Sequence, residues 1–152
     1  MVSVFSSLRQ SFKGLLVLVP VLIGLAFISP AEAVQWDAET LTVPVNPDGA
    51  EVTFTDREIN AGRKVFNTSC GTCHAGGITK TNQNVGLDPE TLALATPARD
   101  NVDALVDYMK DPTSYDGEYS ISDVHPSMRS AELYPAMRDL DDEDLRLMAG
   151  YI

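Results

Sequence analysis

Cysteine, histidine and basic side chains are all scarce in this sequence of 152 residues. Two cysteines and two histidines are too few for a disulfide-dense scaffold, a four-cysteine zinc cluster or an iron–sulfur centre. Lysine and arginine number 11 against 22 aspartates and glutamates, which gives a net charge of −11. A nucleic-acid partner held by a basic face is therefore set aside. The length and a hydrophobic content of 44% indicate one folded domain.

The first 33 residues have the three parts of a secretory signal peptide. Arg9 and Lys13 are the only charges among residues 1–31, and the apolar run 14–27 follows them. Small residues then occupy positions Ala31 and Ala33. We therefore predict a signal peptide over residues 1–33 with cleavage after Ala33. A retained membrane anchor is the alternative, but the apolar run is shorter than the roughly 20 residues that a spanning helix needs.

The part of the chain after the signal peptide begins with a pattern that predicts a small β-hairpin. Residues 40–45 and 50–54 are rich in Val, Thr and Phe, and the turn-forming sequence Asn-Pro-Asp-Gly separates them. Thr55 and Glu58 then fit a capping box. This box and the apolar periodicity behind it predict a helix that runs into Cys70.

Three further helices are predicted by their start and stop signals. Residues 88–94 begin with Asp-Pro, which suits a helix cap followed by proline at the first helical position. Asp100 is the predicted cap of the next helix, and Pro112 bars its extension. The last helix is predicted to begin at Asp141 or Asp142, where acidic residues favour a helix N-terminus.

Both cysteines and one histidine fall in a single string, Cys70-Gly71-Thr72-Cys73-His74. This is the C-x-x-C-H pattern of covalent c-type haem attachment. Two thiols at this spacing can reach the two vinyl groups on one edge of the porphyrin, while the next residue turns its imidazole to the iron. We therefore predict thioether links at Cys70 and Cys73 to one haem c, with His74 as the proximal iron ligand.

Three other interpretations of the two cysteines are weaker. A disulfide between Cys70 and Cys73 would close a very small loop and add little stability. A thioredoxin-type redox pair would need a βαβ context, which the helix-rich pattern does not provide. A zinc site would have only four candidate ligands, and His125 lies far outside the usual spacing.

The sixth iron ligand is either His125 or a methionine. Met109 and Met148 fall on predicted apolar helix faces, whereas Met128 and Met137 lie with His125 in the irregular segment 113–138, which has room for one short helix near 127–133. Pro126 favours an extended backbone at His125, which can project its ring away from the local chain. Composition and spacing favour His125, with Met128 and Met137 as the alternatives.

Longer strings around the motif are more specific than C-x-x-C-H itself. They are AGGITKTN at 75–82, NVGLDP at 84–89, LATP at 94–97, RDN at 99–101, VDYMK at 106–110, PTSYDG at 112–117 and HPS at 125–127. In these strings residues 36–152 resemble the cytochrome c-550 family, extrinsic subunits of photosystem II. In that family two histidines bind the haem iron, and the corresponding positions here are His74 and His125.

The resemblance implies a mainly α, class I-like cytochrome c domain over residues 34–152, with a short N-terminal β-hairpin. It implies a peripheral protein of the thylakoid lumen that docks on the inner-antenna and reaction-centre proteins of photosystem II, beside other extrinsic subunits such as PsbU. There it would stabilise the oxygen-evolving complex and help to retain calcium and chloride. Lys80 and Arg99 are among few basic residues, and we expect them at the docking surface.

Two other functions compete with this one. A soluble low-potential electron carrier of the lumen or periplasm is the main alternative, although carriers ordinarily use methionine to raise their potential. A haem enzyme is disfavoured, because two protein ligands leave no iron position open to a substrate. Family members also continue past Ile152 in a C-terminal tail that this sequence lacks, so either the sequence is a fragment or this member docks differently.

Overall fold

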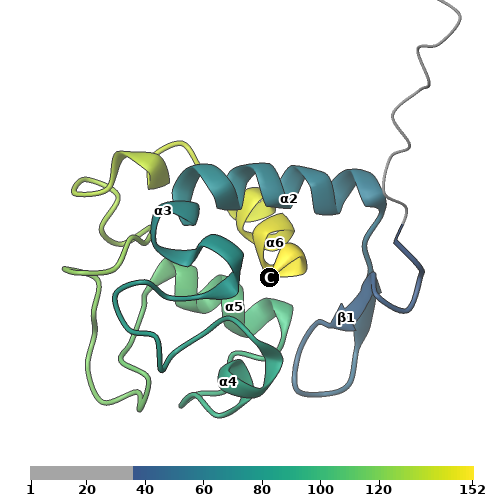
Figure 1. Ribbon diagram of the computed structural model, residues 1–152, viewed down its shortest axis with the longest axis horizontal. Helices are drawn as coiled ribbons and strands as arrows, with labels where there is room; N and C mark the ends of the chain where they lie inside the picture. The colour runs from purple at the N-terminus through teal and green to yellow at the C-terminus, as the bar shows by residue number, and fades with distance from the viewer. Residues whose placement is uncertain (1–35) are drawn as a thin grey trace, which may run out of the picture. The chain divides into compact units, whose positions relative to one another are not determined.

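The computed structural model describes residues 36–152 (Figure 1). The predicted signal peptide, residues 1–33, and its cleavage site lie outside the described residues. Within the described part, no helix is both long and apolar enough to cross a membrane. Among residues 36–152 helices dominate, and one two-stranded antiparallel sheet precedes them. The predicted mainly α domain with an N-terminal hairpin is therefore confirmed.

The hairpin consists of β1 (Thr42–Pro44) and β2 (Glu51–Thr53), with Val43 opposite Val52. Both strands are shorter than predicted, because residues 38–41 form a turn before β1 and residues 45–50 form the turn between the strands. The Val45 amide donates to the Ala50 carbonyl at 2.7 Å. Gly49 closes the turn with φ at +83°, a left-handed conformation that glycine adopts without steric cost. The predicted position of the turn is correct.

Helix α2 (Asp56–Ser69) begins with the predicted capping box. The Glu58 amide donates to Thr55 Oγ1 at 3.3 Å, and the Thr55 amide donates to Glu58 Oε2 at 2.8 Å. The helix ends at Cys70, as predicted, and the short helix α3 (Gly71–His74) follows directly. A 3₁₀ turn, η1 (Ala75–Gly77), leads into the loop that reaches α4. The haem motif therefore lies at the C-terminal end of the longest described helix.

Helix α4 (Pro89–Ala93) is capped as predicted by Asp88, whose Oδ1 accepts from the Thr91 amide at 2.9 Å. Helix α5 (Val102–Lys110) is capped differently from the prediction. The cap is Asn101, whose Oδ1 accepts from the Ala104 amide at 3.0 Å. Asp100 instead accepts from the Asn101 side chain at 3.2 Å. Asparagine and aspartate cap equally well, so the composition at this site could not distinguish the two positions.

The loop layer between α5 and the last helix contains no α-helix at residues 127–133. The prediction of a short helix there is wrong, and the only helical element in the layer is the 3₁₀ turn η2 (Pro135–Met137). Ser127 and Ser130 are buried, and their hydroxyls bond to each other at 2.7 Å. Ser130 Oγ also donates to the His125 carbonyl at 3.2 Å. Side-chain bonds of this kind compete with helical hydrogen bonding.

The final helix α6 (Asp142–Tyr151) is capped by Asp141 and packs across α2 (Figure 1). Its side chains Leu145 and Met148 are fully buried. The two backbones approach closely at Gly62, where a Cβ atom would overlap the Leu147 carbonyl group. Only glycine fits at this crossing. The core therefore lies between α2, α5 and α6, and it fixes the end of α2 that carries the haem motif.

The capping box of α2 is linked to α6 by an ion pair, which predicts a specific acid sensitivity. Glu58 Oε1 lies 2.9 Å from Arg146 Nη2. Hydrogen bonds from Thr55, together with Arg146, lower the pKa of Glu58 to about 2. A lowered carboxyl pKa stabilises the fold above its unfolded value near 4.5, and this contribution is lost as the pH falls towards 2.

We expect Glu58→Gln to lower the free energy of unfolding at pH 7 by about 1 kcal/mol, because the pair is partly exposed to solvent. The difference from the unsubstituted protein should vanish near pH 2. Denaturant unfolding at a series of pH values measures this. Glu143→Gln is the matched control, because Glu143 bonds the same arginine at 2.8 Å without capping α2. Glutamine can itself complete a capping box, so equal losses in the two variants at pH 7 would contradict the stabilisation assigned to the charge of Glu58.

Candidate haem site

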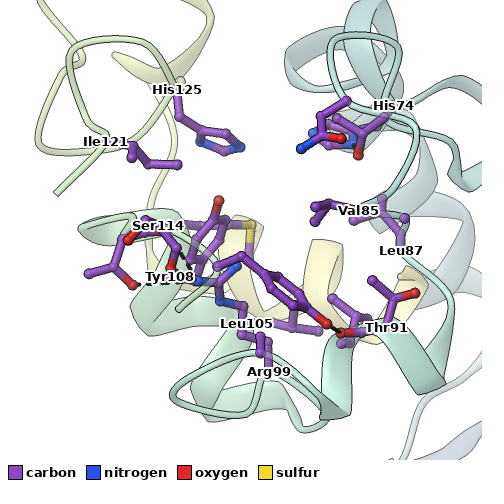
Figure 2. A pocket seen from close by; sticks show the side chains of 18 of the residues that line it. His74, Val85, Leu87, Thr91, Arg99, Leu105, Tyr108, Ser114, Ile121 and His125 are labelled. Atoms are coloured by element: carbon purple, nitrogen blue, oxygen red, sulfur yellow. Dashed lines mark hydrogen bonds between the residues drawn. The ribbon is translucent and has the colours of Figure 1, made fainter. Parts of the chain in front are cut away.

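A cavity of about 500 Å³ opens beside the haem motif (Figure 2). This volume is within the range of small-molecule and cofactor sites. Its walls come from the end of α2, from α3, from the α4–α5 region and from the loop layer. Apolar side chains make up much of the lining, among them Phe66, Val85, Leu87, Leu105 and Ile121. The cavity can therefore hold a large, mainly apolar group.

His74 and His125 face each other from opposite walls at one end of this cavity (Figure 2). Their ring centroids are 6.1 Å apart, and the ring planes are inclined at 53°. A metal ion bound at about 2 Å by one nitrogen of each ring would place the centroids about 6 Å apart. The separation therefore fits one iron between two imidazoles. The structure brings together the two histidines that the sequence places 51 positions apart.

Hydrogen bonds at Nδ1 orient both rings. His125 Nδ1 lies 2.9 Å from the Pro126 carbonyl oxygen, which can only accept, so Nδ1 carries the proton and Nε2 keeps its lone pair. His74 Nδ1 lies 3.1 Å from Thr79 Oγ1. Burial lowers the pKa of both histidines. Both rings are thus held in the neutral form, which is the form that binds metals.

The two cysteines lie in one tight turn before His74. The amides of Cys73 and His74 both donate to the Cys70 carbonyl at 3.0 Å. Cys70 lines the cavity, whereas Cys73 is half-buried and does not form part of the lining. Burial, with a smaller contribution from Cys73, raises the pKa of the Cys70 thiol to about 11. A thioredoxin-type pair needs a lowered thiol pKa, so this site does not suit that chemistry.

Neither of the other two interpretations of the cysteines has support in the structure. Both thiols are free, with no disulfide between them. In the part of the chain that the structure describes, no three His, Cys, Asp or Glu side chains gather at a metal-binding distance.

Neither of the two methionines that the sequence left as alternative iron ligands reaches the cavity. Met137 is 1% exposed, and Met128 packs against the hydrophobic core, but neither lines the cavity. Met148 is part of the core, as predicted. Met109 is also in the core, and it is the one methionine of residues 36–152 that reaches the cavity wall. His125, in contrast, faces His74 directly.

Arg99 is a cavity residue, although the sequence led us to expect it at a docking surface. Only 6% of Arg99 is exposed, so the expected surface contact is wrong for this residue. Its guanidinium lies 4.0 Å above the centre of the Tyr108 ring, and both side chains line the cavity. Lys80 is exposed as expected, and its Nζ donates to the Thr72 carbonyl at 2.7 Å. The sequence around a single arginine does not show whether its side chain lines a buried cavity or lies on the exposed surface.

Tyr108 is the second cavity residue that sequence reasoning missed. Its ring meets the His125 ring edge-on, with centroids 5.2 Å apart. Tyr108 follows Leu105 by three positions on α5, so helical periodicity places it beside the buried stripe. That spacing was the sequence signal that could have identified Tyr108 as a cavity residue.

The helical fold, the haem motif and the facing histidines together define a class I-like cytochrome c domain.

Comparison with known proteins gives the family. The cytochrome c-550 domain family matches residues 34–152, and the chain belongs to this family. Photosystem II extrinsic protein V of Synechococcus sp. (strain CC9605) is 87% identical over 152 residues, which cover 100% of this chain and 89% of the relative. The protein of the same name from Porphyra purpurea is 59% identical over 120 residues, covering 79% and 74% of the two chains.

Solved structures agree with this assignment. The crystal structure of cytochrome c549 matches with a TM-score of 0.74 at 49% identity, covering 76% of this chain and 90% of the other. The PsbV2 cytochrome of Thermosynechococcus elongatus matches with a TM-score of 0.62 at 34% identity, covering 72% and 78%. The resemblance drawn from the sequence strings is confirmed, and so is the class I-like cytochrome c fold.

Proposed function

We propose that this chain binds one haem c covalently through Cys70 and Cys73, and that His74 and His125 take its two axial positions. The observation that carries the proposal is the pair of imidazoles facing each other at 6.1 Å across an apolar cavity. When bound, haem supplies one-electron redox chemistry. We also propose, from the sequence pattern, that residues 1–33 are the signal peptide of an exported precursor and that residues 34–152 are its cytochrome domain.

The chain's own residues set the properties of this site. The Pro126 carbonyl and Thr79 hydroxyl orient the two imidazoles, and such outer hydrogen bonds hold a ligand in one tautomer. With one imidazole nitrogen of each histidine bound to the iron, no iron position would remain for a substrate or for peroxide. We therefore propose that the protein is not a haem enzyme. Paired histidines also favour a lower potential than a histidine–methionine pair.

The place of action is proposed from the relatives and the family. Relatives across cyanobacteria and algae are named photosystem II extrinsic protein V. We propose that this chain is an extrinsic subunit of photosystem II on the lumenal side of the thylakoid membrane. It contacts the inner-antenna and reaction-centre proteins and other extrinsic subunits such as PsbU, stabilises the oxygen-evolving complex and helps to retain calcium and chloride.

Removal and rebinding of the protein tests this function. We expect concentrated salt to wash the protein off photosystem II membranes from its own source, because the chain carries a net charge of −11 and ionic contacts weaken with salt. Oxygen evolution should then fall, and added calcium and chloride should restore much of it. Rebinding of haem-loaded protein should remove the need for added ions.

The electron-carrier alternative gives a different result in the same experiment. If rebinding changes only the rate of electron delivery to a soluble acceptor and leaves the ion requirement unchanged, the stabilising function is wrong. Lys80→Glu should weaken rebinding if the exposed Lys80 contacts the photosystem. Lys64→Glu is the matched control, because Lys64 is equally an exposed lysine but lies on α2. Equal binding of the two variants would remove Lys80 from the docking surface.

A further inference from the structure

Arg99 is a buried cation whose bonding partners are all uncharged. Its Nη2 donates to the Ser114 carbonyl at 2.8 Å, to the Thr113 carbonyl at 3.1 Å and to Thr113 Oγ1 at 3.4 Å. The Tyr108 ring covers one face of the guanidinium at 4.0 Å. Nε and Nη1 make no hydrogen bond within residues 36–152, and the side chain lines the cavity. Two donor groups are therefore available to an occupant of the cavity.

No carboxylate of the described chain balances this charge. Among residues 36–152, no Asp or Glu lies within salt-bridge distance of Arg99. Asp116 also lines the cavity, but its Oδ1 accepts from the Ser114 hydroxyl and from the Glu118 amide. Asp100, the neighbour in sequence, is exposed and bonds Asn101. A buried charge without a counter-charge is costly, so an anionic group is needed beside Arg99.

We propose that Arg99 binds a carboxylate at the edge of the haem. This proposal rests on the proposed haem function. Haem carries its two propionate carboxylates on the edge opposite the vinyl groups that form thioethers. Cys70 lies where α2 meets α3, whereas Arg99 lies between α4 and α5. Figure 1 shows α3 and α4 well apart. In Figure 2 Arg99 lies at the end of the cavity away from the two histidines.

The same arrangement links the carboxylate site to the iron site. Arg99 stacks on one face of Tyr108, and Tyr108 meets His125 edge-on with ring centroids 5.2 Å apart. Arg99 is therefore a positioning residue as well as an anion-binding one. A planar guanidinium can hold a carboxylate through two parallel hydrogen bonds, which an ammonium group cannot.

The test uses the haem-loaded, exported protein with Arg99→Gln, Arg99→Lys and a control, Arg138→Gln. Arg138 is an exposed arginine whose side chain also bonds backbone carbonyls, those of Ala131 and Glu132. Resonance Raman spectroscopy reports hydrogen bonding at the haem carboxylates through their bending band. We expect that band to shift in both Arg99 variants, more in Gln than in Lys, and to stay unchanged in Arg138→Gln.

Redox titration at pH 8 gives a second readout. Loss of a positive charge disfavours the reduced iron, so at a fixed applied potential the ratio of reduced to oxidised haem should fall roughly tenfold in Arg99→Gln. This is the order expected for a unit charge at about 10 Å in an effective dielectric of about 20. Arg99→Lys keeps the charge, so its potential should stay near that of the unsubstituted protein.

An unchanged Raman band and potential in Arg99→Gln would overturn the proposal while leaving the haem function intact. Haem that is absent from the unsubstituted protein, or that is not covalently attached, would instead overturn the proposed function. Arg99→Gln can also fail to fold, because Arg99 anchors residues 113–114. A crystal structure of the unsubstituted haem protein then decides. A carboxylate oxygen within about 3.2 Å of Nε or Nη1 supports the proposal, and two carboxylates bonded elsewhere overturn it.

Discussion

His125→Ala is expected to convert the oxidised haem protein from a low-spin to a mainly high-spin spectrum. Imidazole nitrogens from His74 and His125 provide a strong ligand field on both faces of the iron. Without His125, its position is taken by water, which is a weak ligand. The unsubstituted protein should also lack the weak far-red absorption band of methionine bound to ferric iron. Absorption and electron paramagnetic resonance spectra measure both features.

Two methionine variants are the controls for this result. Met128→Leu and Met137→Leu should leave the spectrum unchanged, because neither side chain lines the cavity. His125→Met should keep the iron low-spin but raise the reduction potential, because a thioether favours ferrous iron. A low-spin spectrum that survives in His125→Ala and is lost in one of the methionine variants would show that methionine is the sixth ligand.

A double variant, Cys70→Ser with Cys73→Ser, is expected to lose covalently bound haem completely. In the unsubstituted protein, acid–acetone extraction should leave the colour with the protein, because thioether bonds survive the treatment. In the double variant the colour should leave with the solvent. Thr72→Ser is the matched control, since it changes the same short turn without touching a sulfur atom. Colour that leaves the unsubstituted protein would contradict covalent attachment.

The same double variant should also lose most of its stability. At about 24 cal/mol per Å³, a cavity of about 500 Å³ kept as a dry void would cost about 12 kcal/mol. The whole free energy of unfolding of a domain is typically about 5–15 kcal/mol. The domain is therefore not stable enough to keep this cavity empty and dry. When haem is absent, the cavity must fill with water or collapse. Denaturant unfolding followed by circular dichroism should show a lower and broader transition than in Thr72→Ser.

Features of the fold that depend on neighbouring residues were predictable from the sequence. The capping box of Thr55 and Glu58, the Asp88 cap and the turn at Gly49 all involve bonds between residues no more than a few positions apart. Such bonds leave recognisable patterns. The haem motif is likewise local, so the amino-acid sequence alone was enough to select Cys70 and His74 as candidates.

Features that depend on distant contacts were not predictable in this way. Spacing alone favoured His125 over Met128 and Met137 without deciding between them, because the choice depends on which side chain the loop layer turns towards His74. The burial of Arg99 depends on residues 113–114, which fold back over it. One hydrogen-bonded pair of buried serines, Ser127 and Ser130, takes the place of the short helix that residue propensities allowed.

The crossing of α2 and α6 at Gly62 also bears on the order of events while the protein is made. Arg146 bonds Glu58 across 88 positions of the sequence, so α2 cannot dock against its partner until residues 142–151 are present. In a chain that emerges from its N-terminus, both thiols of the haem motif are therefore present before the core between α2, α5 and α6 can form. Contacts between such distant segments also form late in folding. The turn that carries Cys70 and Cys73 is therefore attached to a fixed core only after α6 has docked against α2.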